Sequence, residues 1–157
     1  ELDLAAVVRQ VVAEVAPQAV EQQQDIEVAA QAPCRVRGDA TLLAVLVRNL
    51  VDNAVRYSGP GAAVKLAVAA IEPDGARLAV EDSGPGISAE LRQRLFQPFA
   101  AGQAHSGSGL GLTICREIVL ALGGSIQLDN RLDRGQVRGL DATVRLPLAT
   151  GTMNPDT

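Results

Sequence analysis

The segment NLVDNAVRYSGPG, residues 49–61, carries two asparagines one helical turn apart inside an otherwise apolar run. Asn disfavours a helix interior by about 0.5 kcal/mol relative to Ala, because its amide competes for nearby backbone groups. Since each residue turns a helix by about 100°, Asn49, Asn53 and Arg56 share one narrow face, with Tyr57 beside Asn53. The pattern predicts a polar stripe at the border of a buried helix. Such a stripe is either a ligand site or a solvated helix edge.

The segments around this helix predict a mixed fold. Apolar residues at helical spacing predict one helix from Leu4 to about Val20, and Asp39 is suited to cap the helix that contains the stripe. A short helix at 88–95 and a longer one at 109–124, ended by Gly123 and Gly124, follow. Strands are expected at 25–30, 34–39, 62–71, 76–82, 125–129 and 140–148, with a tight turn at 72–75. This order favours a two-layer α/β sandwich with a mixed sheet.

The composition limits the function classes. The chain has 157 residues, 47% of them apolar, and a formal charge of -4. This length and apolar content are enough to bury the core of one domain. We expect that domain at 1–149, followed by a disordered tail at 150–157. The single lysine, Lys65, argues against a nucleic-acid surface, which needs clustered Lys and Arg. Cys34 and Cys115 show no CxxC spacing, so we expect reduced core residues. No apolar stretch approaches the roughly 20 residues that span a bilayer, so the covered chain is expected to be soluble.

A second polar feature follows the strand that is expected to end at Asp82. The turn DSGPGI, residues 82–87, contains Gly84 and Gly86, which can adopt backbone conformations closed to other residues. An ionised Asp only accepts hydrogen bonds, so it complements the exocyclic amine of adenine and disfavours guanine, which has a carbonyl there. A surface turn without a ligand is the alternative.

A glycine-rich segment, GSGLGL at 107–112, precedes the last expected helix. Backbone N–H groups at a helix start, flanked by glycines, form a phosphate site. A dinucleotide-binding motif would need Gly at Leu112, and a P-loop would need a Gly-Lys pair that is absent. A helix cap without a ligand stays open. The preceding loop of small residues is typical of a mobile lid, and its lone His105 is a weak candidate nucleophile.

In this order, NLVDNAVRYS, DSGPGI, LFQPF (95–99) and GSGLGLTI resemble the N, G1, F and G2 boxes of the sensor histidine kinase catalytic domain, a member of the GHKL superfamily. The resemblance spans nearly the whole chain. It implies the Bergerat ATP-binding fold, in which a mainly antiparallel sheet packs against about three helices. It also implies ATP and Mg²⁺ as cofactors.

The resemblance implies a role for each matching position. Asn53 resembles the Mg²⁺ ligand, and Asn49 and Arg56 resemble phosphate partners that act in catalysis. Tyr57 resembles a nucleotide contact, and Asp82 resembles the carboxylate that binds adenine. The other nucleotide-binding positions that it implies are Gly84, Gly86, Ile87, Phe99, Gly107, Ser108, Gly109, Leu110, Gly111 and Leu112.

Asn49 distinguishes the subfamilies, because the ATPases of this fold carry a glutamate base there. Its amide favours phosphoryl transfer to a histidine of a separate dimerisation domain, which needs mainly positioning and charge neutralisation. The acceptor motif is absent here, since the only histidine is His105. The chain is therefore expected to be the monomeric catalytic part of a homodimeric bacterial kinase. The resemblance also implies a cognate response regulator, and a cytoplasmic domain whose parent is anchored in the inner membrane.

One departure from the family pattern keeps alternatives open. Many members have an Arg just after the second Phe of the F box, where this chain has Ala100 and Ala101. Arg56 or Arg94 would then have to stabilise the transferred group. The alternative functions are a nucleotide-binding module that has lost transfer activity and an ATP-hydrolysing clamp of the same fold.

Overall fold

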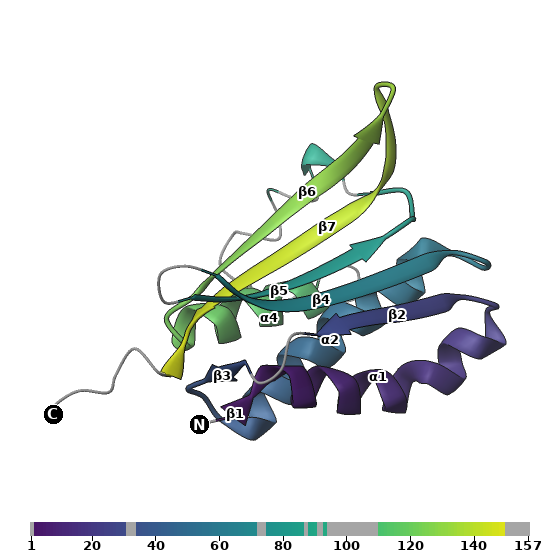
Figure 1. The fold of residues 1–157 in the computed structure, drawn as a ribbon. Coiled ribbons are helices and arrows are strands. Elements are labelled where there is room, and N and C mark those ends of the chain that lie inside the picture. Colours follow the sequence, from purple (N-terminus) through teal and green to yellow (C-terminus); the bar gives the residue numbers. More distant parts are fainter. Residues whose placement is uncertain are drawn as a thin grey trace, which may run out of the picture.

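Three helices lie on one face of a five-stranded sheet in the computed structural model, which describes residues 2–30, 34–71, 75–86, 88–90, 93 and 110–149 (Figure 1). The described helices are α1 (Leu4–Glu21), α2 (Ala40–Ser58) and α4 (Leu110–Ala121). The sheet contains β2 (Asp25–Ala30), β4 (Ala63–Ile71), β5 (Gly75–Asp82), β6 (Ser125–Asp133) and β7 (Gln136–Pro147). A separate two-stranded sheet pairs β1 (Leu2–Asp3) with β3 (Arg35–Val36).

The strand order is β2-β4-β5-β7-β6, which confirms the mixed, mainly antiparallel sheet. Among the described strands of this sheet, only the pairing of β2 with β4 is parallel; the β4–β5, β5–β7 and β6–β7 pairs are antiparallel. The expected two-layer sandwich is thus confirmed. Within the residues that the structure describes, no helix has both the length and the apolarity required to cross a membrane.

The local features predicted for α2 are present. Asp39 caps the helix, with Oδ1 accepting from the backbone N–H of Thr41 at 2.7 Å and of Leu42 at 3.1 Å. The predicted apolar stripe is buried against the sheet and the other helices; it consists of Leu43, Val47, Leu50 and Ala54. Burial of this stripe fixes which face of α2 remains for polar side chains.

Both cysteines are buried free thiols, as predicted. Burial raises the pKa of Cys115 to about 12, and burial also raises the pKa of Cys34. A thiol is nucleophilic only as the thiolate, so both residues act as small apolar core residues here.

The last two strands are longer than predicted. The sequence pattern ended the first at residue 129 and began the second at 140, whereas β6 reaches Asp133 and β7 starts at Gln136. Arg134 and Gly135, both with positive φ, close this hairpin. It extends past the rest of the sheet (Figure 1), and its side chains near the turn are exposed on both faces, which removes the alternation that marks a strand.

Some expected features fall outside the described residues. These are the tip of the β4–β5 turn at 72–74, the loop that carries His105, and the tail at 150–157. Half of the helix expected at 88–95 falls outside them as well.

Candidate functional site

The polar stripe of α2 lies where the buried face meets the surface. Asn49 and Asn53 are half-buried, Arg56 is exposed, and Tyr57 is 38% exposed. The Asn49 amide nitrogen donates to the Val45 carbonyl one turn earlier, at 3.0 Å. The other end of this amide, the Asn49 side-chain oxygen, can only accept hydrogen bonds.

Asp82 ends β5 and is buried, with 7% of the residue exposed. Its Oδ1 accepts from the backbone N–H of Gly84 at 2.9 Å and of Leu140 at 3.3 Å. Burial raises the pKa of Asp82, while these two hydrogen bonds and the positive charge of Arg131 act in the lowering direction. The site therefore holds an oriented acceptor in a largely water-excluded position, where a hydrogen bond to a ligand is strong.

The turn after Asp82 packs directly against the end of α2. A Cβ on Gly84 would lie 2.8 Å from the Tyr57 carbonyl oxygen and 2.8 Å from the Ser58 Cα. Gly86 has a φ of +79°, and a Cβ there would collide with Val137 and Asn130 of the β6–β7 hairpin. Only glycine fits these two positions. Because Gly84 has no side chain, the turn that follows Asp82 lies directly against the end of α2.

Gly84→Ala is expected to lower the free energy of unfolding by about 1–3 kcal/mol, because the new methyl group meets backbone atoms that cannot rotate away. Urea denaturation measures this loss. Gly38→Ala is the matched control, since the nearest atoms to its Cβ would be side-chain atoms of Leu122 and Leu43, at 3.4 Å. Equal midpoints for the two variants would contradict the close contact between the turn and α2.

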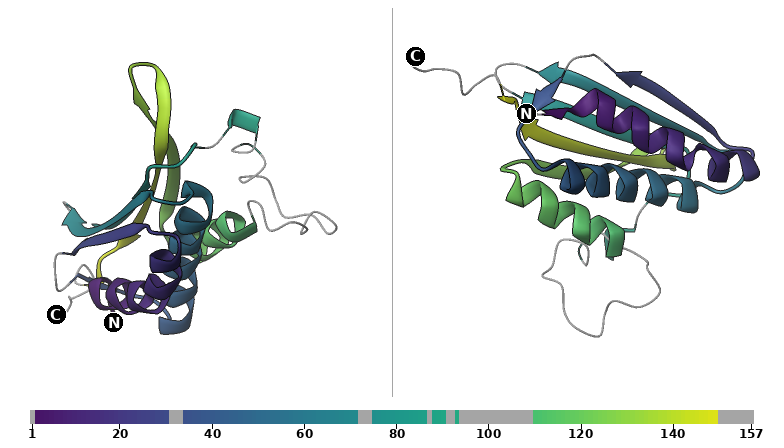
Figure 2. Two further views of the ribbon diagram at one scale, coloured as in Figure 1. Left: turned by 90° about the vertical axis from the view of Figure 1, so that its right-hand side faces the viewer. Right: turned by 90° about the horizontal axis from the view of Figure 1, so that it is seen from below.

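The third element of the site is the start of α4, which runs antiparallel to α2 (Figure 2). Near the start of α2, a Cβ on Gly38 would lie 3.4 Å from Leu122, just beyond the end of α4. Further along, the Cys115 thiol donates to the Leu46 carbonyl at 3.7 Å. The first turn of α4 therefore lies beside the half of α2 that carries Asn49 and Asn53, and buried Leu112 anchors it.

The structure thus brings the α2 stripe, the Asp82 turn and the start of α4 to one end of the helical layer. Leu110 and Gly111 lie in the first turn of α4, and the backbone N–H groups and dipole at a helix start favour an anion. Ile87, Phe99, Gly107, Ser108 and Gly109 lie outside the described residues. The ligand contacts assigned to all these positions stay predictions.

Two residues that support the site were not predicted from the sequence. Gln24 is 5% exposed, and its Nε2 donates to the Val55 carbonyl at 2.9 Å and the Gly59 carbonyl at 2.8 Å, so it caps the end of α2. Arg131 donates from Nη2 to the Asp82 carbonyl at 2.6 Å. Gln24 lies in a polar run, QQQD, and Arg131 in a segment without alternation, so neither carried a signal of burial or of a long-range contact.

The donor set fits a magnesium ion bound together with a polyphosphate. Among the described residues, no group of three or more His, Cys, Asp or Glu side chains is arranged to hold a metal ion. Mg²⁺ prefers oxygen ligands and usually keeps several waters. The amide oxygen of Asn53 is a donor of this type and would add no negative charge, so phosphates and water would have to supply the other ligands.

Comparison with known proteins identifies the family. Residues 38–150 match the family described as histidine kinase-, DNA gyrase B-, and HSP90-like ATPase, and the chain belongs to it. The histidine-protein kinase/phosphatase MprB of Mycobacterium avium is 34% identical over 118 residues, which cover 73% of this chain and 23% of MprB. The sensor protein BasS of Escherichia coli is 55% identical over 47 residues, which cover 30% of this chain and 12% of BasS.

Solved structures agree with this assignment. A mycobacterial sensor histidine kinase MprB structure has a TM-score of 0.81 at 32% identity and covers 94% of this chain and 95% of its own. The nucleotide-free catalytic domain of histidine kinase ThkA has a TM-score of 0.78 at 28% identity, with coverages of 93% and 94%. The chain is thus an ATP-binding catalytic domain of the two-component histidine kinase type. It spans less than a quarter of the curated relatives named above.

Proposed function

We propose that this domain binds Mg-ATP between α2, the Asp82 turn and the start of α4, and presents the γ-phosphoryl group to a histidine on a separate dimerisation domain. The observation that carries the proposal is the buried, doubly hydrogen-bonded Asp82 carboxylate, joined to the asparagine-bearing helix by the contact of Gly84. A fixed acceptor selects the adenine amine, and the neighbouring amides and helix start suit phosphates and their cation.

We assign each candidate residue a separate contact with the bound nucleotide, according to its chemistry. Asp82 accepts from the base, and Tyr57, exposed at the end of α2, covers the nucleoside. Asn53 would hold a magnesium ion through its amide oxygen, and the ion would neutralise part of the phosphate charge. Arg56 offers a guanidinium that matches phosphate oxygens, and Asn49 orients a phosphate through its amide.

Asn49 also sets the type of reaction. A side-chain amide cannot accept a proton from water at neutral pH, so this position offers no general base for hydrolysis. The phosphoryl group is then kept for a nucleophile that docks from another domain. Positioning and charge neutralisation supply most of the catalysis in such transfers.

The parent protein is proposed to be a homodimeric sensor kinase whose catalytic domain lies in the cytoplasm of a bacterium, with the parent anchored in the inner membrane. Its downstream partner is proposed to be a response regulator. In support, histidine kinase ThkA, 26% identical with a TM-score of 0.78, has been solved in complex with the response regulator TrrA.

Calorimetric titration tests the binding half of the proposal. The wild-type chain should bind ATP with Mg²⁺, more weakly with EDTA, and GTP not at all at the same concentrations. Incubation with a helical hairpin that carries an acceptor histidine should then yield phosphohistidine. Binding without transfer would favour a module that has lost transfer, for which Ala100 and Ala101 give a reason. Steady hydrolysis by the isolated chain would favour the ATPase clamp.

A further inference from the structure

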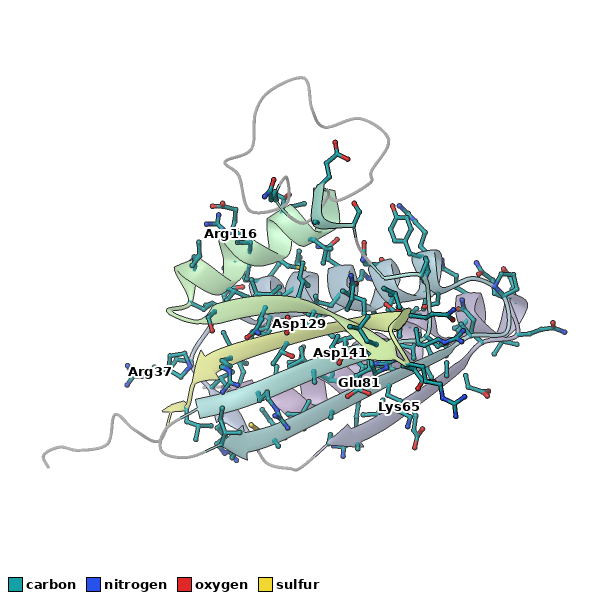
Figure 3. The ribbon with its side chains drawn as sticks, turned by 90° about the horizontal axis from the view of Figure 1, so that it is seen from above. Arg37, Lys65, Glu81, Arg116, Asp129 and Asp141 are labelled. Carbon is teal, nitrogen blue, oxygen red and sulfur yellow. The ribbon has the colours of Figure 1, made fainter. Side chains whose placement is uncertain are left out.

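Arg131 connects three strands from the open face of the sheet. Its Nη1 forms an ion pair with Asp141 on β7 and lies 3.8 Å from the Glu81 Oε1 on β5. Its Nη2 donates to the Asp82 carbonyl at 2.6 Å. Figure 3 shows Glu81 and Asp141 side by side on the face of the sheet that is opposite the helices. The guanidinium therefore reaches from β6 across β7 to the last residue of β5.

Gly139 provides the path for this side chain. It is the register partner of Arg131 on β7. A Cβ at Gly139 would collide with the Arg131 guanidinium and with the Asp82 carbonyl oxygen. The arginine and the glycine are thus two parts of one arrangement, because any side chain on Gly139 would push the guanidinium off the strand end.

This arrangement holds Asp82 at both of its polar ends. The backbone N–H of Leu140 donates to the carboxylate, while Arg131 donates to the carbonyl of the same residue. A strand end fixed in this way cannot rotate its carboxylate away from the turn without breaking a charge-assisted hydrogen bond.

Electrostatics supports the same conclusion. Among the described residues, the charged groups that act on the Asp82 carboxyl are Arg131 from β6 and Asp141 from β7, and α2 presents backbone atoms of Tyr57 and Ser58 to the adjacent Gly84. Arg131 lowers the pKa of Asp82, whereas burial and Asp141 raise it. Without the arginine, Asp82 would share its surroundings with an uncompensated carboxylate.

We propose that Arg131 is a positioning residue for base recognition: through the gap at Gly139 it holds the end of β5 so that the Asp82 carboxylate meets the adenine amine. The proposal rests on the proposed function, because it assigns Asp82 to the base. In this proposal Arg131 acts through Asp82 and is assigned no contact with the nucleotide.

The test compares ATP with inorganic triphosphate, which lacks a base, on the whole chain with Mg²⁺. Arg131→Ala is expected to weaken ATP binding about tenfold and leave triphosphate binding unchanged. Arg131→Lys should restore part of the loss, since an ammonium keeps the charge without the planar fork. Arg138→Ala is the matched control: this exposed arginine of the same hairpin donates from Nη2 to the Gln136 Oε1 at 2.9 Å, and the variant should bind ATP as the wild type does.

The pH dependence adds a readout that a purely structural role would not move. Loss of a nearby cation raises the pKa of a carboxylate, so ATP binding by Arg131→Ala should fail at a higher pH on acidification than wild-type binding, and Arg131→Lys should reverse the change. Two results would overturn the role of Arg131 while leaving the proposed function intact. One is an equal loss of ATP and triphosphate binding in Arg131→Ala, and the other is that ATP binding fails at the same pH in this variant and in the wild type. Absence of ATP binding by the wild-type chain would overturn the proposed function together with it.

Discussion

Asp82→Asn is expected to weaken ATP binding by about 10- to 100-fold while inorganic triphosphate binds as before. A hydrogen bond to a charged acceptor contributes about 1.5–3 kcal/mol, and about 1.4 kcal/mol is a factor of ten. The amide retains one oxygen for the N–H groups of Gly84 and Leu140, so the turn keeps its two internal hydrogen bonds. Its NH₂ end, however, presents donors where the adenine amine needs an acceptor. Calorimetric titrations with the two ligands give the ratio directly.

The stability of this variant provides its control. Because burial raises the pKa of Asp82 in the folded chain, the folded state binds more protons than the unfolded state just above the ordinary Asp range. The free energy of unfolding contributed by this group then falls as the pH rises through that window. Asp82→Asn removes this decline, so at pH 7 its urea midpoint should equal or exceed that of the wild type. A parallel loss of ATP and triphosphate binding would argue against a role of Asp82 in base selection.

The sequence predicted those parts of the fold that follow from periodic burial. The stripe of α2 could be read in advance because Leu43, Val47 and Leu50 recur at helical spacing and all pack into the core. The cap at Asp39 could be read because a short polar side chain before an apolar run satisfies free N–H groups. Both signals are local, so they need no knowledge of the tertiary structure.

The missed parts depend on contacts between distant segments. Gln24 is buried only because the turn after α1 meets the end of α2, where the glutamine caps two carbonyls. The role of Arg131 depends on its contacts with Gly139 and Asp82, which lie on two other strands. A polar residue in a polar run has the same local pattern whether it is solvated or supports a site, so only the folded arrangement distinguishes these cases.

The candidate site shows the same division. Helix geometry alone assigns Asn49, Asn53 and Arg56 to one face, with Tyr57 beside Asn53. The structure puts the two asparagines at the border of the core. The closeness of Asp82 to this face rests on Gly84, which lies against backbone atoms of Tyr57 and Ser58. Glycine carried a signal of turn conformation in the sequence but no indication of which element the turn would meet.

Asn53→Ala is expected to remove the enhancement of ATP binding by Mg²⁺. Loss of a residue that only supports a metal ligand already reduces metal affinity by about 10- to 100-fold, so loss of the ligand itself should cost at least about 100-fold. ATP should then bind with the same weak affinity in Mg²⁺ and in EDTA, whereas the wild type should differ between the two. Asp52→Ala is the matched control, a half-buried neighbour on the same helix that should leave the enhancement intact.

The same substitution should stabilise the fold, which separates a lost ligand from a damaged helix. Ala is favoured over Asn inside a helix by about 0.5 kcal/mol, and Asn53 is only half-buried, so its replacement leaves no large cavity. A higher urea midpoint combined with lost magnesium dependence would mean that α2 keeps an unfavourable residue at this position because the ligand requires it. Retained magnesium dependence would remove Asn53 from the metal site, and the asparagine stripe would then be a solvated edge of the helix.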